Sequence, residues 1–206
     1  MTSNTDVRQY WGVPKTSHRE RILAEGLLLV HKHGFARTSV RDIVAAAGVP
    51  QGSFTNHFVS KEAFGLEILE RYYHAAQANM AETLRDDARP ALARLRAYID
   101  GIEDQLNRDN MRCGCLFGNF TAEASDHSEP IRRRVVAIFG DLRESIAYCL
   151  RAAVAAGEVN AGLDCDDVAG FVLSSLEGAI LLSKAYRSPE PIERFKRVLF
   201  DAILAP

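Results

Sequence analysis

The sequence has few of the features that mark membrane or secreted proteins. Among its 206 residues, no apolar run approaches the roughly 20 residues that a bilayer-spanning helix requires. The opening stretch, MTSNTDVRQYWGVPKTSH, lacks the apolar core of a secretory signal. We therefore expect a cytoplasmic protein with no membrane partner.

Cysteine is scarce, with four residues at Cys113, Cys115, Cys149 and Cys165. In a cytoplasmic chain, cysteines are more often free, metal-bound or redox-active than joined in structural disulfides. Two alternatives therefore stay open. Cys113 and Cys115 could form the redox pair of a thiol enzyme, although the spacing is not C-x-x-C and no βαβ pattern surrounds it. The cysteines could also join His127 in a soft-metal sensor, although their scattered spacing gives this reading little support.

Other catalytic signatures are absent. The sequence contains no P-loop, no dinucleotide-binding glycine fingerprint and no metalloprotease helix motif, so we expect neither an enzyme nor a bound cofactor. It shows no internal repeat and no convincing alternation of apolar and polar residues that would predict strands. With 47% hydrophobic and 25% charged residues, the composition is that of an ordinary globular protein. The expected fold class is all-α.

The most informative stretch runs from Thr38 to Phe64 and reads TSVRDIVAAAGVPQGSFTNHFVSKEAF. Ser39 and Asp42 are spaced as in a capping box, which predicts a helix start. Gly48 comes where the apolar face of that helix ends, and glycine takes a left-handed stop at no steric cost. Pro50 suits the first turn of a second, very short helix. Two short helices joined by a tight glycine turn predict a helix-turn-helix, whose second helix enters the DNA major groove.

Charge is distributed unevenly along the chain. Residues 1–61 hold eight Lys or Arg against four Asp or Glu, a net charge of +4, whereas the whole chain carries −2 and residues 62–206 therefore carry −6. A basic first third before an acidic remainder is typical of a head that meets a polyanion and a body that does not. Residues 1–16 are polar and irregular; they form either a loose terminus or an arm that lies along DNA with Arg8 and Lys15.

From Ile22 to Phe64, the chain resembles the DNA-binding domain of the TetR family of bacterial transcriptional regulators. The resemblance is carried by HGFARTSVRDIVAAAGV, GSF, HF and SKEAF, in that order. One residue departs from the pattern: Thr55 stands where relatives usually have a tyrosine that often touches a phosphate. The resemblance implies a three-helix helix-turn-helix head with its N-terminal arm, residues 1–61, and a helical bundle for effector binding and dimerisation, residues 62–206.

Candidate DNA contacts lie on the outer side of the second helix of this motif. Phe54 and Phe58, four residues apart, are expected to face inward, which leaves the polar residues around them outward. Gln51 can make a bidentate pair with adenine, and Ser or Thr can serve bases or phosphates. The candidate contacts with a double-stranded DNA operator are Arg41, Pro50, Gln51, Gly52, Ser53, Thr55, Asn56, His57 and Lys61, of which Arg41, His57 and Lys61 are expected to bind phosphate.

Amphipathic stretches beyond the head predict a bundle of long helices. Their approximate ranges are residues 61–84, 92–106, 131–150, 168–182 and 192–204. Small residues such as Gly170 and Gly178 would let a partner helix approach closely. In TetR-like proteins the last two long helices pair with their copies into a four-helix interface, so we expect a homodimer. Operator reading requires the same arrangement, because two heads must reach half-sites about 34–36 Å apart.

The segment CGCLFGNFTAEAS, residues 113–125, mixes apolar residues with two cysteines and two glycines. It resembles one branch of the family, similar to the repressor of the N-ethylmaleimide reductase gene, in which a cysteine before Leu senses electrophiles. Cys115 occupies that position. A cysteine at a helix N-terminus near the cationic Arg112 would have a stabilised and nucleophilic thiolate. The competing interpretation is a small buried structural cysteine.

These features together predict a ligand-responsive DNA-binding transcriptional regulator. We expect a repressor that leaves a palindromic operator when a small molecule or electrophile enters the body. The effector would bias a pre-existing spread state, in which the two heads no longer match consecutive major grooves. Its pocket should be lined by apolar and aromatic groups of the central helices. The candidates are Tyr73, Tyr98, Ile102, Cys115, Phe117, Asn119, Phe120, Glu123, Phe139 and Phe171.

Overall fold

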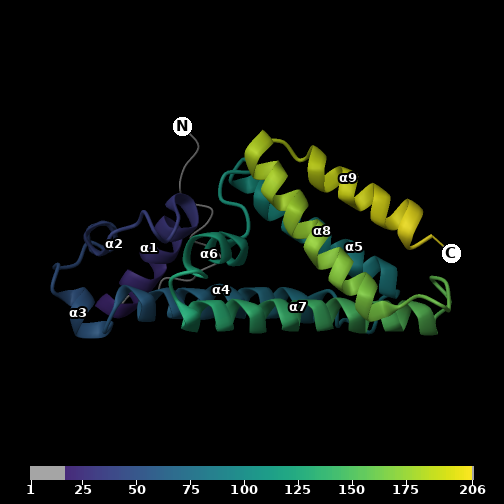
Figure 1. The fold of residues 1–206 in the computed structure, drawn as a ribbon, viewed down its shortest axis with the longest axis horizontal. Helices are drawn as coiled ribbons and strands as arrows, with labels where there is room; N and C mark the ends of the chain where they lie inside the picture. Colours follow the sequence, from purple (N-terminus) through teal and green to yellow (C-terminus); the bar gives the residue numbers. More distant parts are fainter. Residues whose placement is uncertain (1–16, 206) are drawn as a thin grey trace.

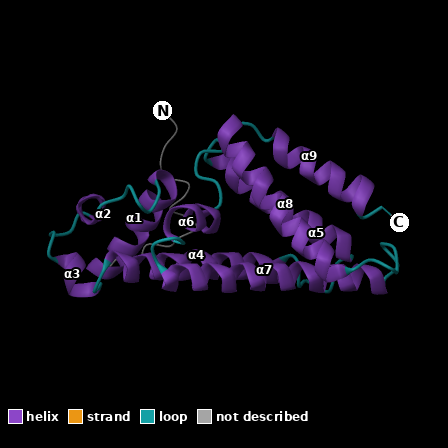
Figure 2. Ribbon diagram, viewed as in Figure 1, coloured by secondary structure: helices purple, strands orange, loops and turns teal. Residues whose placement is uncertain are grey.

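A computed structural model describes residues 17–205, and every regular element in that part of the chain is helical (Figures 1 and 2). The predicted all-α fold class is confirmed. The predicted N-terminal arm, with Arg8 and Lys15, lies outside the described residues. The helices are, in chain order, α1 (His18–His33), α2 (Val40–Ala47), α3 (Ser53–His57), α4 (Lys61–Glu82), α5 (Ala91–Arg108), α6 (Leu116–Ala124), α7 (Glu129–Ala155), α8 (Cys165–Tyr186), α9 (Glu190–Val198) and a π-helical turn, η2 (Leu199–Ile203).

Local sequence sets the ends of the short helices of the head, which comprises α1, α2 and α3. The predicted capping box is present: Ser39 Oγ accepts from the Asp42 N–H at 3.1 Å, and Asp42 accepts from the Ser39 N–H at 3.0 Å. Gly48 ends α2 in the left-handed region with φ +60°, also as predicted. The prediction for Pro50 is wrong in detail. Helix α3 begins only at Ser53, and the Pro50 carbonyl accepts from the Ser53 N–H at 2.9 Å in the turn before it.

Three phenylalanines form the core between the head and α4: Phe54 of α3, its C-cap Phe58, and Phe64 of α4. The ring centroids of Phe54, Phe58 and Phe64 lie 5.1 to 5.3 Å from one another, and all three side chains are buried. Helix α1 comes close to this cluster at Gly26, where a Cβ atom would lie 2.3 Å from Cζ of Phe64 and 3.2 Å from Cγ2 of Ile43. The missing side chain at Gly26 therefore lets α1 and α4 pack at this distance.

The body is a bundle built on two long helices. Figure 1 shows α4 and α7 along the base of the molecule, with α5 and α8 crossing over them and α9 outside α8. Helix α7 contacts α4, α5, α6 and α8, and α8 also contacts α9. The predicted long helix after Lys61 ends at Glu82, slightly before the expected Leu84, and the last predicted helix changes to the π-helical turn at Leu199. Each of the predicted long helices is present in the bundle.

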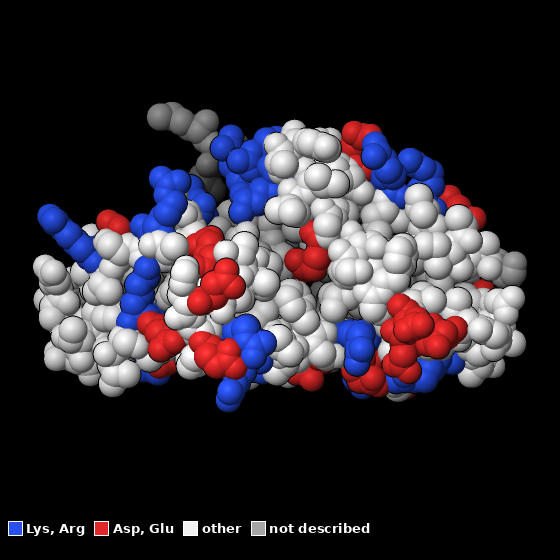
Figure 3. Space-filling view, in the orientation of Figure 1, with Lys and Arg blue, Asp and Glu red and all other residues white. Residues whose placement is uncertain are grey.

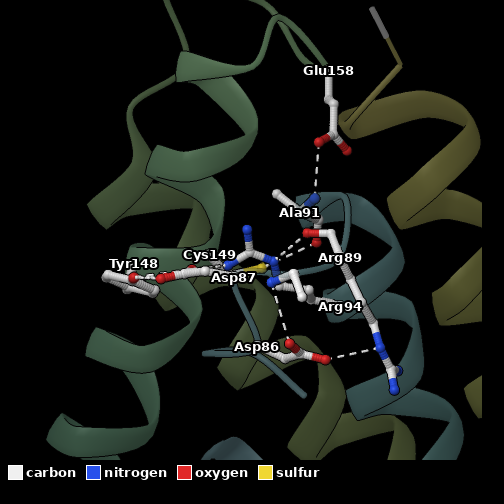
Figure 4. A network of polar contacts seen from close by, with 9 residues as sticks. Asp86, Asp87, Arg89, Ala91, Arg94, Tyr148, Cys149 and Glu158 are labelled. Carbon is white, nitrogen blue, oxygen red and sulfur yellow. Dashed lines mark hydrogen bonds and ion pairs between the residues drawn. The ribbon is translucent and has the colours of Figure 1, made fainter. Parts of the chain in front are cut away.

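A buried arginine ties the α4–α5 connection to α7, at the end of the bundle away from the head (Figure 4). The guanidinium of Arg94 is buried; its Nε donates to the Arg89 carbonyl at 2.8 Å, and its Nη1 pairs with Asp87. Tyr148 of α7 donates its hydroxyl to the same Asp87 carboxylate at 2.8 Å. These two donors lower the pKa of Asp87, which keeps it ionised opposite the buried charge.

The start of α5 is capped from far along the chain. Pro90 precedes α5 and supplies no side-chain cap. Instead, the Glu158 carboxylate accepts from the N–H groups of Ala91 and Leu92 at 2.8 and 2.9 Å, and the first of these bonds is drawn in Figure 4. Free N–H groups in the first turn of a helix are favourable sites for an anion. The turn after α7 therefore fixes where α5 begins.

Helix α8 is the most apolar long element among the described residues. By length and composition alone it could cross a membrane, with a mean hydropathy of 1.4 over its most apolar 18 residues. One side of α8 packs on α7 and α9, and 33% of this window is buried. Its outer side nevertheless exposes several large apolar residues. These are Phe171, Leu181, Leu182 and Tyr186. Several large apolar residues exposed on one helix are typical of a protein–protein interface.

We predict that Gly26→Ala destabilises the protein, because the added methyl group overlaps the Phe64 ring. Overpacking of this kind usually costs about 1–3 kcal/mol. Gly140→Ala on α7 is the matched control, because a Cβ there meets no atom within 4 Å; it should gain about 0.5–1 kcal/mol from helix propensity. Unfolding in guanidinium chloride at a fixed protein concentration measures the free energy of unfolding of both variants. Equal stability of the two variants would contradict the close approach of α1 and α4.

Candidate nucleic-acid interface and effector site

The outer side of α3 and the turn before it form an exposed polar surface on the head. The fold does not require glycine at position 52, since its φ is −65° and a Cβ would meet nothing within 4 Å. The open space above Gly52 leaves room for an external group to approach the backbone closely. The exposed members of the predicted DNA-contact set on this surface are Pro50, Gln51, Gly52, Thr55, Asn56 and His57.

Two predicted DNA contacts lie elsewhere. Ser53 was expected to face outward, but it is only 8% exposed, and its hydroxyl lies 3.3 Å from Nδ1 of His18 on α1. Lys61 was expected to bind phosphate, but its Nζ donates to the Phe35 carbonyl at 2.6 Å and lies 4.6 Å from the centre of the Phe35 ring. Neither side chain points outward as expected, because Ser53 is bound to α1 and Lys61 to the turn between α1 and α2.

Basic side chains remain available on the rest of the head. Arg41 is exposed on the first turn of α2, as expected for a phosphate contact. On the face drawn in Figure 3, Lys and Arg side chains project over α1 and α2, and groups of both charge signs lie over the rest of the molecule.

The turn at residues 34–36, between α1 and α2, joins the head to the body. The Glu123 carboxylate of α6 accepts from the Ala36 N–H at 2.9 Å, and Lys61 of α4 donates to carbonyls on the same turn. The Phe35 ring packs on Phe120 of α6 with centroids 4.8 Å apart. We call these contacts the head–body joint. Phe120 and Glu123, predicted as pocket residues, belong to this joint.

Cys115 lies among polar side chains from three other helices. It is the N-cap of α6, and the Glu177 carboxylate of α8 lies close to it: a Cβ at Gly118 would be 3.8 Å from Cβ of Cys115 and 2.9 Å from Oε2 of Glu177. Tyr72 of α4 and Tyr98 of α5 are also near, because the charges of Cys115 and Glu177 raise the pKa of both phenols beyond the effect of burial. We call Tyr72, Tyr98, Cys115 and Glu177 the Cys115 cluster.

The surface is open near this cluster. On the face drawn in Figure 3, the molecule is hollowed between α6 and α8, and acidic side-chain atoms are visible in the hollow. Cys115 itself is partly exposed, as is Glu177. A small molecule that enters between α6 and α8 would therefore meet a thiol, a carboxyl group and two phenols.

The cysteines of this structure do not favour the thiolate. Burial raises the pKa of Cys115 well above its usual range, and the charge of Glu177 adds to that effect, whereas the N–H groups of α6 oppose it. The expected stabilisation of the thiolate by Arg112 is wrong, because burial and a neighbouring carboxylate outweigh the helix terminus. Burial likewise raises the pKa of Cys113 to about 12 and that of Cys149 to about 11.

The remaining pocket candidates do not all lie together. Phe117 packs edge-on against Tyr72, Tyr73 and Phe139, with ring centroids 4.9, 6.5 and 6.3 Å away, and forms an aromatic wall beside the Cys115 cluster. Ile102 is half-buried on α5. Phe171 is 47% exposed on the outer side of α8, so its assignment to an internal pocket is wrong.

Asn119 and several unpredicted residues complete the surroundings. The Asn119 side chain donates to the Cys113 carbonyl at 3.0 Å and accepts from Lys184 of α8 at 3.0 Å. Sequence reasoning missed Glu177, Tyr72 and Lys184. Glu177 had a readable signal, because it is the one charged residue between Asp167 and Lys184 in an otherwise apolar helix.

The alternatives based on cysteine chemistry gain no support. Within residues 17–205, no group of three or more His, Cys, Asp or Glu side chains is arranged to hold a metal ion. All four cysteines are free thiols. The soft-metal site that was to combine them with His127 therefore has no counterpart in the described part of the chain.

Comparisons with known proteins identify both parts of the chain. Residues 22–68 match the family model described as bacterial regulatory proteins, tetR family, and residues 91–199 match that of the tetracyclin repressor-like C-terminal domain. The chain is 35% identical over 190 residues to the HTH-type transcriptional repressor DhaR of Mycobacterium sp. strain GP1, covering 92% of this chain and 94% of that protein.

Two further relatives extend the likeness to solved structures. The transcriptional repressor NemR of Escherichia coli K12 is 33% identical over 195 residues, covering 91% of this chain and 94% of NemR. The crystal structure of reduced E. coli NemR superimposes with a TM-score of 0.79 at 30% identity, covering 86% and 92% of the two chains. The structure of regulatory protein TetR from Rhodobacter sphaeroides gives 0.84 at 30% identity, covering 89% and 97%. The chain belongs to the TetR family of bacterial regulatory proteins.

Proposed function

We propose that this DNA-binding transcriptional regulator represses from a palindromic operator as a homodimer, and that capture of a small electrophile by Cys115 releases it. Members of the TetR family bind DNA operators and effectors and are dimeric, and relatives of this chain are transcriptional repressors. The cytoplasm is the compartment that we infer for such a soluble DNA-binding protein.

The exposed surface of α3 is the observation that supports the operator contact. Its polar residues face outward, while Phe54 and Phe58 hold the helix on the head. In the proposed complex, Gln51 and Asn56 read base edges, since amide side chains pair bidentately with adenine. Arg41 and His57 bind phosphates, which fix the register of the helix without reading sequence. Thr55 donates to the Gly52 carbonyl at 3.1 Å, so a phosphate contact there would require its hydroxyl to turn outward.

The apolar outer side of α8 supports dimerisation. Gly170 and Gly178 of α8 have no neighbour within 4 Å of a Cβ position, so a second helix can approach closely there. Charged residues occur on this helix only near its two ends and at Glu177. We assign α8 and α9 to the dimer interface, residues 62–206 to the body, and residues 1–61 to the DNA-binding domain.

Helix α6 links the proposed effector site to the head. Cys115 is its N-cap, and Glu123 near its other end accepts from the N–H of Ala36 in the head–body joint. A helix of this length behaves as a rigid unit, so an adduct that shifts its first turn also shifts Glu123. In this mechanism the effector stabilises a state in which the heads no longer match consecutive major grooves. A coupling of about 1–3 kcal/mol lowers operator affinity roughly 5- to 150-fold.

We predict that Arg41→Ala weakens the salt dependence of operator binding, whereas Lys61→Met does not. Each phosphate contact contributes about 0.9 to the slope of log affinity against log salt, so losing one per protomer should reduce it by about 2 in the dimer. Lys61 already donates to carbonyls of the head. Fluorescence anisotropy with a duplex selected by the wild-type protein measures the slopes. A reduced slope for Lys61→Met with an unchanged slope for Arg41→Ala would contradict the assignment of Arg41 as the phosphate contact.

We predict that Leu181→Glu, on the outer side of α8, produces monomers. Leu181 is 65% exposed in the protomer, and a carboxylate there would be buried without a partner in the proposed interface. Val136→Glu on α7 is the control, because Val136 is equally apolar and 59% exposed but lies outside α8 and α9. Sedimentation at micromolar concentration should find dimers for the control only. A dimeric Leu181→Glu protein would overturn the interface.

We predict that Cys115→Ser retains operator binding but loses release by quinones and aldehydes, because serine supplies no thiol for the adduct. Cys165→Ser, at the start of α8, should respond like the wild type. Gel shifts with and without the electrophile measure release, and intact mass measures the adduct. Release of the Cys115→Ser protein at wild-type concentrations of electrophile would refute a sensing role for Cys115.

A further inference from the structure

Glu177 is a carboxyl group without a counter-charge. Its side chain is largely enclosed, and no ion pair among residues 17–205 includes it. Acidic side chains that pair elsewhere in the body face an arginine or a lysine, as Asp87, Glu70 and Glu103 do. An enclosed carboxylate without a cation costs free energy of folding, so a functional reason for Glu177 is worth seeking.

Glu177 is held directly against Cys115. Each group acts on the pKa of the other: the charge of Glu177 raises the pKa of Cys115, and the thiol lowers the pKa of Glu177 against the larger effect of burial. The carboxylate lies over Gly118 on the first turn of α6, where a Cβ would be 2.9 Å from Oε2 of Glu177 and 3.8 Å from Cβ of Cys115. Glycine at position 118 is thus what allows α8 to bring this carboxylate beside the sulfur.

We propose that Glu177 is the general base, and then the general acid, through which the Cys115 thiol adds to an α,β-unsaturated carbonyl compound. This inference rests on the proposed function, because it concerns the electrophile that releases the repressor. It also names the chemical class of that electrophile. The Glu177 carboxylate lies beside Cys115 on the first turn of α6, and general base catalysis requires such an acceptor within reach of the thiol proton.

The addition is balanced within the site. The sulfur forms a bond to the β-carbon while the S–H proton passes to Glu177, and the π electrons move to the carbonyl oxygen as an enolate. Glu177 then returns the proton to the α-carbon. No oxidant, reductant or leaving group takes part, and the carboxylate is restored at the end. Because Cys115 is a thiol rather than a thiolate, an adjacent base compensates for its raised pKa.

The site suits this class better than electrophiles that expel an anion. Displacement of a halide would leave an anion and a proton in an enclosed space with no cation among the Cys115 cluster. An enolate, in contrast, is neutralised by the proton that Glu177 already holds. Tyr98 is buried beside the pair and supplies a phenol as hydrogen-bond donor for the carbonyl oxygen, a role typical of an oxyanion-stabilising group.

The test compares rates of adduct formation with methyl vinyl ketone. Glu177→Gln keeps the size of the side chain and removes its basicity, so the second-order rate at Cys115 should fall about 100-fold at pH 7, within the usual range for general acid–base catalysis. Peptide mapping by mass spectrometry resolves the sites, and Cys165 in the same molecule is the internal reference. Glu193→Gln, an exposed carboxylate of α9, is the matched control and should react like the wild type.

The pH dependence separates a base from a structural residue. Burial, together with the charges of Cys115 and Glu177, raises the pKa of Tyr72 of α4 and Tyr98 of α5, so both phenols stay neutral from pH 7 to 9. In the wild type, the rate of adduct formation should level off at pH values where Glu177 is already ionised and the Cys115 thiol is still protonated. In Glu177→Gln it should keep rising about tenfold per pH unit, because only free thiolate then reacts.

A second variant guards against misfolding as the explanation. Gly118→Ala keeps Glu177 but pushes its carboxylate away from the sulfur, so it should lower the Cys115 rate while operator binding stays intact. A wild-type rate and pH profile in Glu177→Gln would overturn the role of Glu177 and leave electrophile release standing. Absence of any Cys115 adduct in the wild type, with operator release preserved, would overturn both proposals.

Discussion

The clamp on residues 34–36 is the constraint on which the rest of this structure depends. One N–H and two carbonyl groups of this short turn are bound by side chains from two different helices, Glu123 of α6 and Lys61 of α4. The ring of Phe35 fills the space between them, against Phe120 and over Gly65. The head therefore cannot rotate on the body unless these charged hydrogen bonds break or α6 and α4 move with it.

This constraint gives α6 its importance. Helix α6 has only nine residues, about 13 Å along its axis, and a side chain at each of its ends contacts another part of the molecule. The N-terminal end faces α8 through Cys115, and the C-terminal end holds the turn of the head through Glu123. Its middle is fixed by Phe117 and Phe120, which are buried. A displacement at one end is consequently transmitted as a movement of the whole helix, because the core around it is close-packed.

Local signals in the sequence were sufficient for the fold but only partly for the site. The capping box at Ser39 and the left-handed Gly48 depend on neighbours within four residues, and both were predicted correctly. The inward turn of Ser53 and the use of Lys61 were not predictable, because their partners lie 35 and 26 residues away in sequence. The pairing of Cys115 with Glu177 joins α6 to α8 for the same reason. Residue spacing predicts which side chains share one face of a helix, whereas tertiary packing decides which residues of other helices they contact.

The cap on α5 bears on the order in which the chain becomes organised as it leaves the ribosome. The first N–H groups of α5 are satisfied by Glu158, 67 residues downstream of Ala91. The head depends on contacts made within its first few dozen residues and can assemble early, since domains generally form as units during synthesis. The end of the bundle away from the head must wait until the turn after α7 has emerged. A nascent chain halted before residue 158 would thus carry a formed DNA-binding head on a body whose second helix lacks its anchor.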